Sequence, residues 1–303
     1  MHSRMFKACV AAPAFAAALL LSAAGMAEAK TLNVVASMTV LADVVSVVGG
    51  NHVNVKSLVG PNGDPHVYEP TPEDAKALKE ADAVFISGDG LEGWMERLIK
   101  ASGYKGKPTV ASAGIKTHKM VDDGKTVTDP HVWNDPKNGI IWTQNIVKAL
   151  SAADPEDAAD FKANGDKMIA DLAAIDQDAK KAVDAIPASK RKVLTTHDAL
   201  GYFGRAYGVE FLAPQGLSTE SEASAADVGK IIKQIRREGV KVYFFENSND
   251  PRMVEQIAKE TGATSGGTLY VESLSKADGP APTYLKMLKY NIDLLTTAMA
   301  KNG

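Results

Sequence analysis

One stretch near the middle of the chain decides its fold, namely PEDAADFKANGDKMIADLAAIDQDAKKAVDA, residues Pro155–Ala185. Asp154 suits a helix N-cap, Pro155 suits the first helical position, and the next proline comes only at Pro187. Apolar side chains recur at helical spacing, at Phe161, Met168, Ile169, Leu172, Ile175 and Ala179. The pattern predicts a helix of about 30 residues and about 45 Å, which is longer than a small domain. Gly165 leaves open two shorter helices that are broken near it.

We interpret residues 153–186 as a rigid helix that connects two lobes, because strands alternate with helices on both sides of it. Before it, β-rich runs such as Leu32–Ser37 and Ala83–Ser87 alternate with amphipathic stretches. After it, Lys192–Thr196 and Val242–Phe245 do the same. Such alternation favours βαβ units with parallel strands. The sequence therefore predicts an α/β protein of two similar lobes, residues 30–152 and 187–303, with mainly parallel sheets.

Residues 1–29 have the three-part pattern of a secretory signal peptide. A basic start precedes a nearly continuous apolar stretch, and Ala27–Ala29 forms an A-x-A cleavage site. The apolar core is shorter than the roughly 20 residues of a spanning helix, so a membrane anchor is the weaker alternative. The only cysteine, Cys9, comes too early for a lipoprotein signal. We expect a periplasmic mature chain without cysteine, whose metal ligands would be His, Asp, Glu or water.

Three histidines lie in informative contexts. His66 and His131 both lie in the tetrapeptide Asp-Pro-His-Val, where proline stiffens the loop that presents the imidazole. His197 directly follows a predicted strand, at the position where open α/β sheets bind their ligands. Three imidazoles and one carboxylate would form a closed tetrahedral site for zinc, and such a site also accepts manganese or iron(II). His52 and His118 lie in polar stretches, and we interpret them as solvated surface residues.

From Leu32 to Met299 the chain resembles the zinc/manganese-binding periplasmic components of metal ABC transporters, cluster A-I type. The matching segments are collinear: Gly63–Pro72, Leu91–Trp94, Asp129–Trp133, Thr196–Phe203, Leu217–Glu222, Asp227–Arg236 and Glu246–Asn247. The resemblance implies two α/β lobes joined by one long helix and a single metal ion between them. It also implies that the protein delivers this ion to a membrane-embedded ABC permease and is not an enzyme. We expect the protein to be a monomer.

The resemblance implies metal ligands at His66, His131 and His197, and a fourth ligand at Glu272. The family usually has aspartate at the fourth position, so binding through one or through two oxygens of the longer glutamate stays open. Glu246 is expected to make hydrogen bonds rather than to bind metal, and Asp198 either orients His197 or lies at a helix N-terminus.

Two features of the sequence bear on which metal is bound, and they point in opposite directions. By the resemblance, the histidine at position 197 favours zinc, because many zinc-type members have histidine there and many manganese-type members have glutamate. Dedicated zinc members often carry a His-rich insertion before the second ligand, whereas Thr117–Thr128 contains only His118. Zinc is therefore the first expectation, with manganese or iron(II) as the alternative.

Composition and motifs weigh against other classes of function. The formal net charge is only −3, which provides no strong basic field for nucleic acid. The chain has no G-x-S-x-G nucleophile motif and no Gly-rich phosphate loop. A zinc-dependent hydrolase, with three histidines and an open position on the metal, is the rival interpretation. A role in surface adhesion is the third interpretation. It is weakened because cleavage of the signal peptide would leave the mature chain without a membrane anchor.

Overall fold

The structure is a computed structural model that describes residues 31–122, 125–216, 219 and 224–302. The predicted signal peptide, residues 1–29, lies outside the described residues. From Thr31 onward the chain forms one compact unit. Within the described ranges, no helix is long and apolar enough to cross a membrane.

The N-terminal lobe is built on a four-stranded sheet with the order β2-β1-β3-β4. Its strands are all parallel, and Val34 lies opposite both Val55 and Ala83. The strands are β1 (Leu32–Ala36), β2 (Val53–Ser57), β3 (Ala83–Ile86) and β4 (Thr109–Val110). The helices between them are α1 (Thr39–Gly49), α2 (Pro72–Glu80) and α3 (Met95–Ser102). Helix α2 begins at Pro72, where the N-cap residue Thr71 and Asp74 in the first turn form a capping box.

The C-terminal lobe repeats this plan, and the prediction of two similar α/β lobes is confirmed. Its sheet has the order β10-β9-β7-β8, which is the N-terminal strand order read from the other edge. The strands are again parallel, and Leu194 lies opposite Leu212 and Tyr243. They are β7 (Lys192–Leu194), β8 (Glu210–Leu212), β9 (Val242–Glu246) and β10 (Thr264–Leu269). The helices are α6 (Gly201–Tyr207), α7 (Ala225–Glu238), α8 (Arg252–Thr261) and α9 (Tyr284–Met299).

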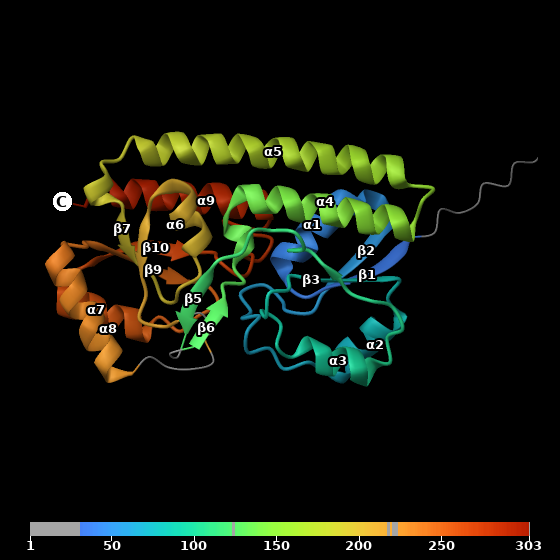
Figure 1. The fold of residues 1–303 in the computed structure, drawn as a ribbon, viewed down its shortest axis with the longest axis horizontal. Helices are drawn as coiled ribbons and strands as arrows, with labels where there is room; N and C mark the ends of the chain where they lie inside the picture. The colour runs from blue at the N-terminus through green and yellow to red at the C-terminus, as the bar shows by residue number, and fades with distance from the viewer. Residues whose placement is uncertain (1–30, 123–124, 217–218, 220–223, 303) are drawn as a thin grey trace, which may run out of the picture. The chain divides into compact units, whose positions relative to one another are not determined.

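A long helix spans both lobes. Helix α5 (Ala158–Asp184) has 27 residues, or about 40 Å at the usual rise, and it runs beside α4 (Pro136–Ala153) and α9 (Figure 1). It is unbroken at Gly165, where a methyl group would overlap Val147 of α4. This glycine therefore allows α4 and α5 to pack closely and does not end the helix. The expected start was wrong, because Asp154 is the C-cap of α4 and α5 begins only at Ala158.

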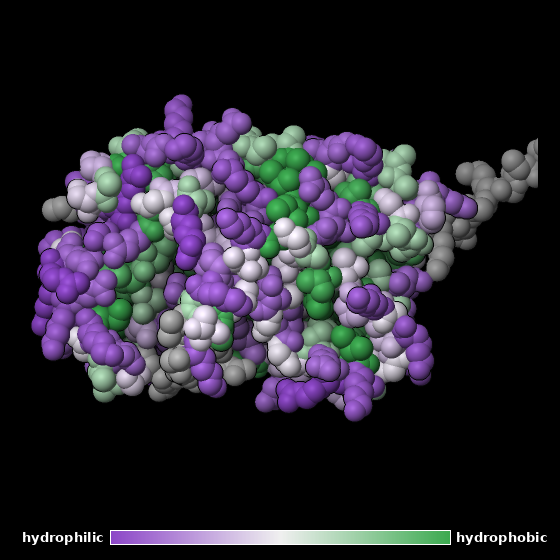
Figure 2. All heavy atoms as spheres, viewed as in Figure 1, coloured by the Kyte–Doolittle hydropathy of each residue, from purple (hydrophilic) through white to green (hydrophobic). Residues whose placement is uncertain are grey.

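Sequence reasoning missed α4, β4 and β10, and also an antiparallel hairpin of β5 (Lys119–Asp122) and β6 (Lys125–Thr128). One apolar core runs through both lobes and includes Val44 of α1, Ile175 of α5 and Leu295 of α9. On the face drawn in Figure 2, hydrophilic side chains predominate over α7 and α8. The long helices thus share one core with both sheets, which fixes the carboxyl ends of the strands from which the site is built.

Candidate metal centre

The two Asp-Pro-His sequences present their histidines through the same local turn. An Asp64 carboxylate oxygen accepts a hydrogen bond from the backbone N–H of His66 at 2.8 Å. Asp129 accepts the equivalent bond from His131 at 3.0 Å. The turn is encoded locally, since the aspartate bonds to the backbone two residues on and the intervening proline restricts it. Each histidine is therefore held at a fixed point of its loop.

Asp129 also fixes the orientation of its imidazole. Its Oδ1 lies 2.9 Å from Nδ1 of His131, so that Nε2 faces the centre. A carboxylate behind a ligand histidine is the usual way in which proteins orient a metal-binding imidazole. Asp64 does not do this for His66, because its second oxygen accepts a hydrogen bond from the Thr219 hydroxyl at 2.5 Å.

Glu246 orients the third imidazole. His197 follows β7, and one Glu246 oxygen accepts the backbone N–H groups of Thr196 and His197 at 3.0 and 3.1 Å. The other oxygen pairs with Nδ1 of His197. The hydrogen-bonding role expected for Glu246 is confirmed, whereas the orienting role considered for Asp198 belongs to Glu246. His197 and Glu246 are far apart in sequence. Only the pairing of β7 with β9 places the carboxylate of Glu246 behind the imidazole of His197.

The three histidines converge on Glu272, which follows β10. Its Oε1 lies 2.7 Å from Nε2 of His66, 3.1 Å from Nε2 of His131 and 3.3 Å from Nε2 of His197. Its Oε2 instead accepts a hydrogen bond from the Ser248 hydroxyl at 3.2 Å. The structure thus brings together all four residues expected as ligands, with one glutamate oxygen aimed at the centre.

This donor set fits a transition-metal ion. His66 is 7% exposed, and His131, His197 and Glu272 are fully buried. Nε2 of His66 and Nε2 of His131 face each other at 3.2 Å, and Nε2 of His197 has no hydrogen-bond partner among the described residues. Bonds of about 2.0–2.2 Å would place ligand atoms about 3.3–3.6 Å apart in a tetrahedron. The separations of 2.7–3.3 Å therefore need to widen by less than about 1 Å to hold an ion.

The charges of the centre are strongly coupled. Burial alone would lower the pKa of His131, but the hydrogen bonds and charges of Asp129 and Glu272 outweigh it and raise this pKa to about 9. Burial alone would also lower the pKa of His197, but the charges of Glu246 and Glu272 raise it well above its ordinary value. Burial would raise the pKa of Glu272, yet the neighbouring histidines hold it well below its usual range. Without metal, the imidazolium groups therefore neutralise the buried glutamate.

The other two histidines of the described chain were wrongly interpreted as solvated. The ring of His118 packs on Tyr202 with centroids 4.1 Å apart, and its Nε2 lies 3.5 Å from Asp129. His52 lies between two aspartates near the start of α5, at 2.6 Å from Asp157 and 3.0 Å from Asp160. Asp157, Asp160 and Tyr202 come from distant segments, and Asp129 comes close to His118 only because the β5–β6 hairpin folds back on itself.

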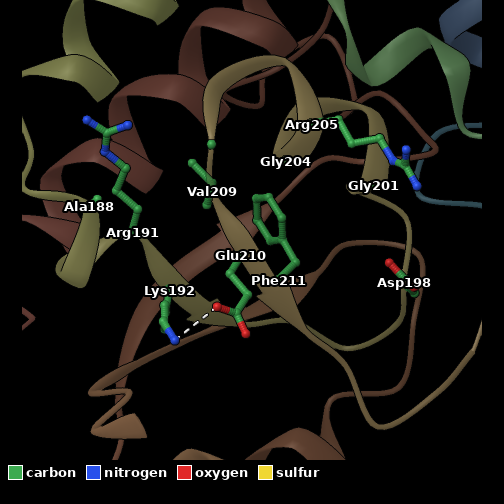
Figure 3. A pocket seen from close by; sticks show the side chains of 11 residues that line it. Ala188, Arg191, Lys192, Asp198, Gly201, Gly204, Arg205, Val209, Glu210 and Phe211 are labelled. Atoms are coloured by element: carbon green, nitrogen blue, oxygen red, sulfur yellow. Dashed lines mark ion pairs between the residues drawn. The ribbon is translucent and has the colours of Figure 1, made fainter.

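A separate pocket of about 370 Å³ lies between α6 and the edge strand β8 (Figure 3). None of the four converging residues lines it. Two of its charged side chains, Lys192 and Glu210, pair with each other at 3.0 Å. The pocket therefore contributes nothing to the metal centre.

The sequence profile of the family described as "ZnuA: Zinc-uptake complex component A periplasmic" matches residues 34–298. The chain belongs to this family. The resemblance inferred from the sequence is thereby confirmed, and this ZnuA-family protein is a metal-binding component of an ABC transporter and not an enzyme.

Relatives of this ZnuA-family protein are named for, or have structures bound to, different metals. The iron ABC transporter substrate-binding lipoprotein MtsA of Streptococcus pyogenes is 32% identical over 300 residues, 95% of this chain and 97% of the relative. The periplasmic zinc-binding protein TroA of Treponema pallidum has 30% identity and a TM-score of 0.83, over 90% of this chain and 100% of TroA. The manganese-bound periplasmic metal-binding protein of Candidatus Liberibacter asiaticus has 30% identity and a TM-score of 0.78, over 88% and 98%.

Proposed function

We propose that this protein binds one zinc ion through His66, His131, His197 and Glu272, and delivers it to the permease of an ABC importer. The observation that carries the proposal is the convergence of three imidazole Nε2 atoms on a single buried glutamate oxygen. The burial of all four side chains matches a site that closes around its cargo. Import of manganese or iron(II) through the same residues is the alternative, since one related protein is named for iron and the structure of another is manganese-bound.

The choice of zinc rests on the chemistry of the donors. Three neutral imidazoles and one carboxylate oxygen form the four-coordinate nitrogen-rich set that suits zinc, whereas manganese prefers more oxygen ligands. The orientation of Glu272 supports this choice, because Oε1 lies among the three Nε2 atoms whereas Oε2 lies 3.2 Å from the hydroxyl oxygen of Ser248.

The test is a competition titration of the metal-stripped mature protein with zinc and, separately, with manganese, each against a chelator of known affinity. We expect one tight zinc site per chain and much weaker binding of manganese. Comparable affinity for the two ions would favour the alternative cargo. The absence of a tight site for either ion would refute metal capture by these residues.

Substitution with cobalt(II) tests the coordination number. We expect the strong visible absorption of a tetrahedral cobalt site, because the protein supplies four ligand atoms and the centre is fully buried apart from His66. Weaker absorption, typical of five- or six-coordinate cobalt, would show that water, a second glutamate oxygen or both bind the ion in addition. The pH dependence of the spectrum separates a closed carrier site from an open hydrolase site, because a water on the metal of a hydrolase site ionises near neutral pH and a closed site holds no such water.

We further propose that residues 1–29 are removed on export and that the mature chain acts as a periplasmic monomer with lobes at 30–152 and 187–303. The early position of Cys9 supports cleavage without lipid attachment. The intact mass of the exported protein should correspond to a chain that begins at Lys30. A mass that includes a lipid would instead indicate an anchored protein.

A further inference from the structure

Asp129, whose carboxylate orients His131, is hydrogen-bonded at every polar atom but one. Its Oδ1 accepts from the backbone N–H of His131 at 3.0 Å and lies 2.9 Å from Nδ1 of the same residue. Its own N–H donates to the carbonyl of His118 at 3.1 Å, and its carbonyl accepts from the Tyr202 hydroxyl at 2.8 Å. Only Oδ2 is buried without a hydrogen-bond partner among the described residues. The carboxylate therefore cannot turn without disturbing a bond to His131.

The remaining oxygen of Asp129 lies against Gly201, the first residue of α6. A methyl group at Gly201 would come within 2.8 Å of Oδ2 and within 3.2 Å of the ring carbon Cε1 of His118. Close packing does not allow a carbon and an oxygen to approach to 2.8 Å, so one of the two would have to move. Gly201 is not among the glycines with positive φ. The space beside Asp129, and not the backbone conformation, therefore requires glycine here.

Neither neighbour of Gly201 is free to give way. The side chain of Asp129 is 1% exposed, and a shift of Oδ2 also moves the Oδ1 that holds His131. The ring of His118 packs on the ring of Tyr202, with centroids 4.1 Å apart. A side chain at position 201 would therefore act first on the carboxylate that orients a ligand.

The contact at Gly201 connects ligands that come from different lobes. Gly201 follows His197 by four residues, and Asp129 precedes His131 by two. The segment after His197 is also fastened to the N-terminal lobe, because the side-chain amide of Asn134 donates to the carbonyl of Ala199 at 3.0 Å. The start of α6 thus rests directly on the residue that aims the imidazole of the opposite lobe.

We propose that Gly201 is a positioning residue of the metal centre. Because it has no side chain, the segment after His197 closes on Asp129 without displacing its carboxylate, and Nε2 of His131 keeps its direction toward the ion. This inference rests on the proposed function, because it assumes that His131 binds the ion. It gives the start of α6 a part in metal binding, although the four proposed ligands all lie outside this helix.

The test is zinc competition titration of Gly201→Ala in the mature protein. We expect zinc binding to be weakened about tenfold, at the low end of the roughly 10- to 100-fold cost of disturbing a group that orients a ligand histidine. Gly229→Ala is the matched control, because Gly229 lies in α7 of the same lobe and a methyl group there meets nothing within 4 Å. The control is expected to bind as the native protein does. Native affinity in Gly201→Ala would overturn the proposal.

Double variants locate the cause of the loss. Gly201→Ala should cause no further loss when it is added to Asp129→Ala, because the carboxylate that it meets is gone. It should also cause none when it is added to His131→Ala, because the imidazole that it misdirects is gone. A loss that persisted in either background would show that the methyl group acts through the fold or through lobe closure, and the assignment would be wrong. If Gly201→Ala alone did not fold, a folded double variant with Asp129→Ala would place the collision at this carboxylate, and an unfolded one would overturn it.

Proton NMR of the zinc-loaded protein supplies a readout that does not depend on affinity. When Nε2 of His131 binds the ion, Nδ1 carries the proton that Asp129 accepts, and this proton should give a downfield resonance that is absent in His131→Ala. We expect Gly201→Ala to move this resonance upfield and Gly229→Ala to leave it in place. An unchanged resonance in Gly201→Ala would contradict the proposal.

The proposed function and the role of Gly201 fail differently. Unchanged zinc affinity in His131→Ala would refute the ligand set itself. A large loss in His131→Ala together with none in Gly201→Ala would refute only the role of Gly201.

Discussion

Lowering the pH from 8 to 6 is expected to weaken zinc binding by at least about 100-fold, because the His131 imidazole must lose a proton when the ion binds, and the raised pKa of His197 adds to this loss. The charges around His131 raise its pKa to about 9, and the pKa of His197 lies well above its ordinary value. Below these values each imidazole is protonated in the metal-free protein, so each contributes about a tenfold loss of affinity per pH unit. Glu272 does not offset this effect, since its pKa is held well below the usual range and it is already ionised.

Calorimetric titrations in buffers of different ionisation enthalpy would count the released protons directly. Release of one to two protons per zinc ion at neutral pH is expected, one from His131 and the rest from His197, with an affinity that rises about tenfold per pH unit for each proton released. Circular dichroism at each pH is the control that the protein stays folded. Zinc binding with no proton release would show that the imidazoles are neutral in the metal-free centre.

Replacement of His131 by alanine is expected to weaken zinc binding by roughly 100- to 1000-fold, if the binding energy of a four-ligand zinc site is shared about equally among its ligands. The imidazole of His131 is fully buried and also pairs with Asp129 at 2.9 Å and with Glu272 at 3.1 Å. Its removal therefore leaves the negative charge of Asp129 without its partner as well as removing a ligand. Competition titration against a chelator measures the loss.

His52→Ala is the matched control for this variant. It also removes an imidazole that is paired with carboxylates, but His52 lies with Asp157 and Asp160 near the start of α5. We expect its zinc affinity to equal that of the native protein. A similar loss of affinity in both variants would mean that the effect comes from general destabilisation and not from the metal centre.

Much of the fold was predictable because its signals are local. The apolar spacing from Phe161 to Ala179 lies on one helix, and α5 follows that pattern through Gly165. Helices α7 and α8 likewise have a local end signal, because each is followed by a glycine in the left-handed conformation, Gly239 and Gly262. The start of α5 was misplaced because Asp154 and Pro155 serve a turn between two antiparallel helices. A capping pattern looks the same there as at a helix start.

By itself, the sequence determined the features that depend on neighbours within one or two turns of chain: the alternation of strands and helices, the long helix, and the stiff Asp-Pro-His loops that present His66 and His131. The identity of Glu272 as the fourth residue came from likeness to a family, and only the tertiary structure places it among the histidines. The tertiary structure alone decided that Glu246 orients His197 and that Gly201 and Tyr202 contact Asp129. These contacts join residues about 50 to 70 positions apart. No local pattern encodes such pairs, because each partner satisfies ordinary local rules and the two meet only when both sheets pack on the long helices.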